Sequence, residues 1–398
     1  MPLRRRYYAY RATTFPGFVF PVATLFLLAR DLSFTGIAAA GAAAIVVGVV
    51  GEVPTGYVAD RLGRRNTLLA AAVAHTLAQA GYLLVYSVPV AAAVVSVSAL
   101  AESLQSGTLD AWLYDVLAAR DEGDDYTAVL GRGESVRRYA GAAMMVAAGP
   151  LYAADPTSPF YAMAVVNTAS VASLLFLPKA PAREREQSFS PRRAATAIRS
   201  ALWTPNLRSY VVFAALTVAS VRVSMEYLQP VAVDSLSVLP SDPAASVGLL
   251  YAGFTAIAGV ASDRAAALRD RFGVRAVLLG APLATACLFV AVAFAPWLVL
   301  PAFVAMRPMG AVVRTVRSRY LNDRIESVGR ATVMSAASLV FSVVRFPLLL
   351  GAGVVADAFG PYVALSAVNA AFVGCAAVLW VVETPIRVGR DTGVVPAD

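Results

Sequence analysis

Long apolar runs are the feature that most constrains this chain. Twelve of them, each close to the roughly 20 residues that cross the hydrocarbon of a bilayer as a helix, are separated by short polar segments. The chain is 59% hydrophobic with a mean hydropathy of +0.67, whereas a soluble domain is roughly 45–50% apolar. A soluble fold of 398 residues would have no use for so much apolar surface. The sequence therefore predicts an all-α membrane protein that crosses the bilayer many times.

The apolar runs form two groups of six on either side of a long polar break. We expect a six-helix bundle at 1–178, a central cytoplasmic loop with a short amphipathic helix at 179–206, and a second six-helix bundle with a short tail at 207–398. The predicted spans cover residues 7–28, 36–59, 67–86, 90–117, 133–152, 160–177, 207–233, 247–268, 276–294, 297–320, 331–356 and 361–382.

Positive charge is distributed in a pattern that predicts the orientation of the chain. The formal net charge is +8, and Lys and Arg lie on alternate connections between spans. In the intervening connections, residues 32–35, 87–89, 155–159, 234–246 and 357–360 include neither Lys nor Arg. Because cytoplasmic loops are rich in Lys and Arg, we expect a protein of the cell membrane with both termini in the cytoplasm. The arginine excess then reports topology and anionic lipid, and no nucleic-acid partner is expected.

A weak internal repeat relates the two groups of spans. The segment Asp-Arg-Leu-Gly-Arg-Arg at 60–65 returns as Asp-Arg-Phe-Gly-Val-Arg at 270–275. Gly131-Arg132, at the entry to the fifth span, returns as Gly329-Arg330 at the entry to the eleventh. Transporters often preserve such internal symmetry. The sequence therefore predicts two pseudo-symmetric six-helix bundles.

The loop after the second span resembles a family signature. Residues 56–65, GYVADRLGRR, fit the pattern G-x-x-x-D-R-x-G-R-R of the major facilitator superfamily. Together with the twelve spans, the repeat and the basic central loop, this makes the whole chain look like that family. The resemblance implies two bundles that rock about a central site and expose it to each side in turn. It also implies a small-molecule substrate, a lipid-embedded chain, no cofactor and, we expect, a monomer.

The motif and its repeat predict a gate on the cytoplasmic side. Asp110 and Asp115, near the inner end of the fourth span, are the two candidate partners for an arginine of the motif. Gly56 has no side chain, so another helix could approach it closely, and Gly63 permits a tight turn. The predicted gate residues are Gly56, Asp60, Arg61, Gly63, Arg64, Asp110, Asp115, Asp270, Arg271 and Gly273.

Polar and charged side chains inside the spans predict the pathway for substrate or protons. Such residues are rare in membranes and usually face a cavity or a partner. Each could instead form an internal ion pair that only holds helices together. Glu102 has no basic residue nearby in its own span, and a carboxylate in a low-dielectric cavity can take up and release a proton as access alternates. The predicted pathway residues are Glu52, Glu102, Gln105, Arg222, Glu226, Arg307 and Arg345.

Within the family, the chain resembles the drug:proton antiporters that act as efflux permeases. Gln105 stands near their Gln-Gly-like step in the fourth span, and Gly149-Pro150 fits their glycine-rich fifth span, although Glu102 stands where they usually have an arginine. This resemblance implies proton-coupled efflux of amphiphilic or drug-like compounds. Uptake or exchange of an organic anion is the alternative, because three of the pathway residues are arginines. A non-transporting scaffold or sensor is the alternative from another class.

No catalytic signature supports an enzyme. Residues 351–356 fit a dinucleotide-binding pattern on paper, but they lie within a span and follow no strand. The sequence contains no Ser nucleophile elbow, no HExxH and no phosphate loop with Lys. Cys287 and Cys375 lie in separate apolar spans, so we expect buried, inert thiols and no metal site.

Overall fold

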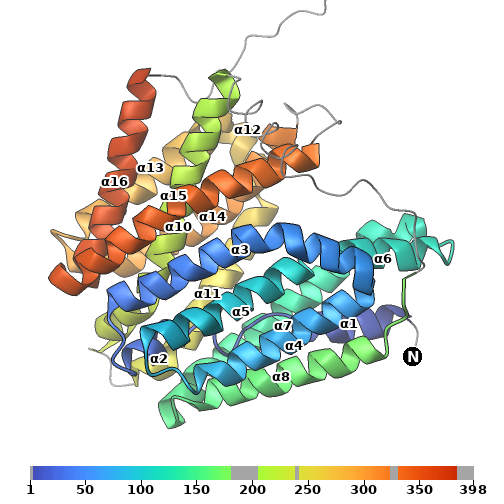
Figure 1. Cartoon of the computed structure of the whole chain (residues 1–398). Coiled ribbons are helices and arrows are strands. Elements are labelled where there is room, and N and C mark those ends of the chain that lie inside the picture. The colour runs from blue at the N-terminus through green and yellow to red at the C-terminus, as the bar shows by residue number, and fades with distance from the viewer. Residues whose placement is uncertain (1–2, 181–204, 238–241, 323–329, 383–398) are drawn as a thin grey trace, which may run out of the picture. The chain divides into compact units, whose positions relative to one another are not determined.

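The computed structural model describes residues 3–180, 205–237, 242–322 and 330–382, which are almost entirely helical (Figure 1). Helices are expected in lipid, because each backbone group must find its hydrogen-bond partner within its own segment. The helices before the polar break are α1 (Leu3–Thr13), α2 (Ala23–Leu28), α3 (Phe34–Leu62), α4 (Arg64–Tyr82), α5 (Val88–Gln105), α6 (Thr108–Ala118), the short η1 (Gly123–Asp125), α7 (Tyr126–Ala154) and α8 (Ser158–Leu175). Those after it are α10 (Pro205–Leu236), α11 (Pro243–Asp263), α12 (Ala265–Arg275), η2 (Ala276–Gly280), α13 (Ala281–Ala291), η3 (Pro296–Leu298), α14 (Val299–Asn322), α15 (Arg330–Phe359) and α16 (Pro361–Val382).

In the described part of the chain, nine helical segments are long and apolar enough to cross a membrane. The expectation of an all-α, multi-pass membrane protein is confirmed. The first, third and fifth predicted spans fall short of this measure for visible reasons. α1 has only 11 residues, α4 begins with two arginines, and α7 carries the charged stretch GRGESVRR. The total of twelve spans stays a prediction.

Two predicted spans are interrupted by a local break in the helix. The first span ends as α1 at Thr13 and resumes as α2 at Ala23, with Pro16 between them. Proline has no backbone N–H to continue the helix. The fourth span breaks between α5 and α6, where Gly107 has φ +71°. Hydropathy follows the apolar character of a segment and does not register such a local change of backbone direction.

The chain packs as two compact units. The first unit comprises residues 1–191, 224–256 and 346–364, and the second comprises 192–223, 257–345 and 365–398. The first unit thus includes two segments from the second half of the sequence. The predicted division at 1–178, 179–206 and 207–398 stays a prediction. The amphipathic helix predicted within the central loop lies outside the described residues.

The first unit is built around helices that lie side by side in Figure 1, α3 against α5, α5 against α4, and α4 against α8. Its largest fully buried side chain is Trp112, whose ring stacks on Tyr7 at 6.2 Å between centroids. The indole N–H donates to the carbonyl of Pro178 at 3.0 Å, which satisfies the only polar group of the buried ring. This core fixes α1, α6 and the end of the first half against one another.

The second unit has its own apolar core, in which Tyr210 and Phe213 of α10 contact Tyr320 and Phe372. Ser220 donates to the buried Asn369 amide oxygen at 2.9 Å, so the polar groups in this core are paired. The two cysteines do not belong to the buried set. The expectation of buried thiols is wrong, because Cys287 and Cys375 are both exposed on their helices.

The repeated loop motif has the same backbone turn in both copies. Gly63 ends α3 with φ 78° and ψ 148°, and Gly273 interrupts α12 with φ 81° and ψ 157°. This left-handed region favours glycine because other residues place a Cβ against the backbone. Among the described residues, apart from the chain neighbours, no atom lies within 4 Å of where a Cβ would stand at either glycine. The two glycines are therefore required by backbone conformation and not by lack of space.

We expect Gly63→Ala and Gly273→Ala each to lower the free energy of unfolding by about 1–2 kcal/mol, the cost of left-handed backbone for an L-residue. Gly253→Ala is the control, because Gly253 lies inside α11 with nothing within 4 Å of a Cβ and no positive φ. That change should be neutral or stabilising. Denaturant titration of the detergent-solubilised protein measures all three, and equal effects at the three positions would contradict the interpretation.

Candidate functional site in the first unit

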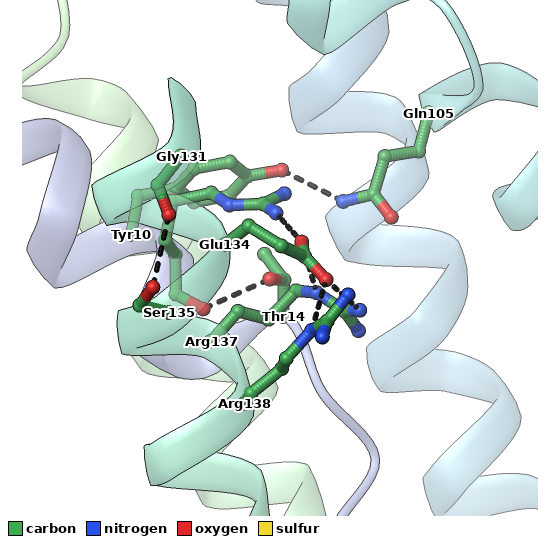
Figure 2. A network of polar contacts seen from close by, with 9 residues as sticks. Tyr10, Thr14, Gln105, Gly131, Glu134, Ser135, Arg137 and Arg138 are labelled. Atoms are coloured by element: carbon green, nitrogen blue, oxygen red, sulfur yellow. Dashed lines mark hydrogen bonds and ion pairs between the residues drawn. The ribbon is translucent and has the colours of Figure 1, made fainter. Parts of the chain in front are cut away.

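The breaks in the first and fourth spans bring two polar side chains together. The hydroxyls of Thr13 and Thr14 donate to the carbonyls of Tyr10 and Arg11 at 2.7 and 2.9 Å, which satisfies the open end of α1. The Gln105 amide, at the last residue of α5, donates to the Tyr10 hydroxyl at 2.9 Å, as Figure 2 shows. The two helix ends therefore meet through a hydrogen bond inside the unit.

The carboxylate of Glu134 lies beside this contact and binds three arginines. Glu134 of α7 accepts two hydrogen bonds from Arg137, at 2.9 and 2.7 Å, and one from Arg138 at 3.0 Å. Arg11 of α1 donates to the same carboxylate. Arg137 and Arg138 follow Glu134 at i+3 and i+4, the spacing of pairs on one helix. Arg11 provides the contact between helices.

The group carries more positive than negative charge. Arg11 is only 8% exposed, and its Nε has no hydrogen-bond partner among the described residues. Three guanidinium groups share one carboxylate, so a second anion arriving here would meet donors that are already oriented. The same arrangement is also a strong structural clamp between α1 and α7. Chemically, the group can hold a carboxylate or other oxyanion.

The predicted pathway residues divide between the two units. Glu102 is exposed on α5, one turn before the break, and Glu52 is exposed on α3. Tyr82 lies close enough to both Glu102 and Glu226 for their charges to act on its hydroxyl group. The first unit thus contains these acids and Gln105, whereas the second contains Arg222, Arg307 and Arg345. Among these residues, Gln105 lies nearest in the contact network to Glu134. It binds Tyr10, and the next residue of α1, Arg11, binds Glu134.

The predicted gate residues meet only in part. Arg64 forms an ion pair with Asp115, which is 5% exposed, and also donates to the carbonyl of Ala111. Of the two acids left open by the sequence, Asp115 is therefore the partner, while Asp110 is exposed in the first turn of α6. The Arg61 guanidinium lies 4.5 Å from the ring centre of Tyr57. The side chain of Asp60 is outside the described residues.

The remaining gate residues can be compared with the prediction only within the described chain. Among those residues nothing lies within 4 Å of a Cβ at Gly56, and the close helix approach expected there stays a prediction. In the repeat, Asp270 pairs with the adjacent Arg269 at 2.6 Å, and Arg271 lies over the ring of Phe272. The second copy of the loop therefore has the same turn, and within the described residues neither Asp270 nor Arg271 forms an ion pair with a neighbouring helix.

The pathway prediction missed Tyr10, Arg11 and Glu134. Arg11 lies inside the first predicted span, and a charge at that depth was the signal that could have found it. Glu134 with Arg137 and Arg138 was visible as a charged cluster at the entry to the fifth span. Sequence spacing showed the pairs within α7, but it could not show that Arg11 joins them.

Double-mutant cycles can compare the Arg11–Glu134 contact with the Arg138–Glu134 contact, because both arginines bind the same carboxylate. The side chain of Arg11 is 10% exposed and that of Arg138 is 56% exposed. We expect a coupling of about 1.5–3 kcal/mol between Arg11→Gln and Glu134→Gln. For Arg138→Gln with Glu134→Gln we expect about 0.3–0.5 kcal/mol. Unfolding free energies of the single and double variants measure both, and a larger coupling for Arg138 would contradict the assignment.

Comparison with known proteins agrees with this architecture. A model of the Major Facilitator Superfamily matches residues 12–264, which is more than half of the chain. No curated protein matches the chain.

Three solved transporters share the fold over nearly the whole length. A mutant of the nucleoside transporter NupG aligns with a TM-score of 0.80 at 13% identity, covering 96% of this chain and 98% of its own. A bacterial homolog of the human lysosomal transporter Spinster gives 0.72 at 13% identity, with 96% and 95% covered. A D-xylose–proton symporter gives 0.64 at 16% identity, with 95% of each chain covered. The fold agrees with the family model, and this protein belongs to the Major Facilitator Superfamily.

Proposed function

We propose that this membrane transporter is driven by protons and exports small amphiphilic or drug-like compounds. Membership in the superfamily makes the protein a secondary transporter and not an enzyme. The observation that carries the proposal of proton coupling is the position of Glu102. It is an exposed carboxylate within a span, one turn before the break between α5 and α6.

A carboxylate at a helix break can change its surroundings when the helix moves. Ser106 donates its backbone N–H to the carbonyl of Glu102 at 2.8 Å, so Glu102 is tied directly to the end of α5. Three residues on, Gln105 binds Tyr10 of the first span. A carboxylate favours its protonated form where it is desolvated and its charged form where water or a cation reaches it. Movement of the first span against the fourth would therefore change the proton affinity of Glu102.

Glu102→Gln imitates the protonated acid in shape. We expect the variant to fold and bind substrate but to lose transport driven by a pH gradient, while energy-independent exchange survives. Proteoliposomes loaded with an amphiphilic fluorescent cation such as ethidium, with and without a pH gradient, measure both activities. Glu52→Gln is the matched control, because Glu52 is also an exposed acid within a span. If Glu52→Gln abolishes gradient-driven transport and Glu102→Gln does not, the coupling residue belongs on α3.

Transport of an organic anion is the second candidate, and the excess of arginine around Glu134 favours it. An anionic substrate could compete with Glu134 for Arg11 and Arg137, which would leave the displaced carboxylate free to bind a proton. The same liposomes loaded with fluorescein in place of ethidium distinguish the candidates. Movement of fluorescein alone supports the anion, movement of ethidium alone supports amphiphile efflux, and movement of neither supports the scaffold or sensor alternative.

The gate role of the loop motif is part of the same proposal. A charge-assisted contact gains strength when its surroundings lose water, and the Arg64–Asp115 pair contains a buried acid. We expect Arg64→Ala to slow transport several-fold and to leave substrate affinity nearly unchanged. Arg6→Ala is the control, because partly exposed Arg6 forms no described ion pair and donates to the carbonyl of Phe176 at 2.9 Å. Equal transport rates in wild type, Arg64→Ala and Arg6→Ala would remove the gate from the proposal.

A further inference from the structure

The segments of the second half that belong to the first unit all come from one end of their helices. Residues 224–256 contain the end of α10, the following connection and the start of α11. Residues 346–364 contain the end of α15, the following connection and the start of α16. Both connections lack Lys and Arg and were predicted to face outside. The first unit therefore joins the two halves of the sequence at the predicted outer side.

Gln229 of α10 makes the main polar contact between the two halves of the sequence within the first unit. Its side-chain oxygen accepts hydrogen bonds from the backbone N–H groups of Thr24 and Leu25, at 2.7 and 3.2 Å. Its amide nitrogen donates to the carbonyl of Phe20 at 2.9 Å. These three backbone groups lie at the break in the first span, where no helix supplies partners. Gln229 is only 5% exposed, so its amide replaces hydrogen bonds that water could not easily make.

Asp357 makes an equivalent contact at the second connection. Its two carboxylate oxygens accept hydrogen bonds from the backbone N–H groups of Phe34 and Thr35, at 2.8 and 2.9 Å. These are the first two residues of α3, a 29-residue helix whose N-terminus carries partial positive charge. The contact is charge-assisted, and it joins the end of α15 to the start of the second span.

Backbones approach closely around both polar contacts. A Cβ at Gly248 of α11 would collide with the carbonyl of Met145, and one at Gly149 of α7 would collide with the carbonyl of Ala245. A Cβ at Gly353 of α15 would stand 2.9 Å from the carbonyl of Phe34. Small residues permit such contact between helices in a membrane. The helices are therefore in backbone contact at these three glycines, whereas Asp357 itself is exposed.

We propose that Gln229 and Asp357 form a lock that holds the predicted outer side closed, and that this side opens only when both side chains leave the first half. When Gln229 leaves, three backbone groups at the break of the first span lose their partners, so opening requires water to reach them. When Asp357 leaves, α3 loses an anionic cap. The lock makes the closed arrangement the resting one without any contribution from substrate.

The test measures distances across this side directly and requires no substrate. Spin labels are placed at Ser87, in the connection after α4, and at Ser237, just after α10, in a background in which Cys287 and Cys375 are replaced by Ser. Both label positions are exposed. Pulsed electron–electron double resonance then measures the distance between the two labels in lipid nanodiscs. Wild type is compared with Gln229→Leu, Asp357→Asn and the double variant.

Gln79→Leu is the matched control. Gln79 is also a buried glutamine, 6% exposed, but it lies in α4 and its side-chain oxygen has no partner among the described residues. We expect both lock variants to shift the distance distribution to longer values, the double variant to shift it most, and Gln79→Leu to leave it unchanged. Unchanged distributions in the double variant, or an equal shift in Gln79→Leu, would overturn the lock. Since no transport is measured, this result is independent of the proposed substrate and coupling ion.

Discussion

The hydrogen-bonding requirement of backbone groups in lipid is the constraint on which this structure depends. A bilayer offers no water to an unpaired N–H or C=O, so a chain of this hydropathy has to be helical. Where a span breaks, side chains have to take over. Thr13 and Thr14 satisfy the end of α1, and Gln229 satisfies the start of α2 from a helix more than 200 positions later. Distant parts of the chain are therefore joined at positions where a helix is interrupted.

Charge follows the same logic. A charge that enters an apolar environment needs a partner, because the cost of leaving it unpaired is several kcal/mol. The two charged side chains described as buried in the first unit both have a partner. Arg11 binds Glu134, and Asp115 binds Arg64. Each pair joins two helices, α1 to α7 and α4 to α6. Because each pair joins two helices, breaking or exchanging the pair would change how those helices pack. A transport cycle requires such changes in helix packing.

The internal repeat is kept in the backbone turn but only in part in the side-chain contacts. Gly63 and Gly273 have nearly the same φ and ψ, so the turn is common to both copies. Arg64 in the first copy is replaced by Val274 in the second, and the ion pair of Arg64 with Asp115 therefore has no direct counterpart there. The turn needs only a glycine, whereas the pair needs an acid at a matching position on another helix. The two halves can thus share a fold and still differ in what their loops bind.

The sequence by itself determined the membrane class, the approximate positions of most helices and the glycine turn of the repeated loop motif. These follow from composition and local backbone rules, and α16 begins and ends at the predicted residues, Pro361 and Val382. The sequence also indicated that Arg64 needs an acid, although it left Asp110 and Asp115 as equal choices. The tertiary structure decided between them. It alone joined Arg11 to Glu134, Gln105 to Tyr10 and Gln229 to the break in the first span. Such contacts depend on which helix faces meet, and periodicity within one segment carries no information about the partner of a side chain in another.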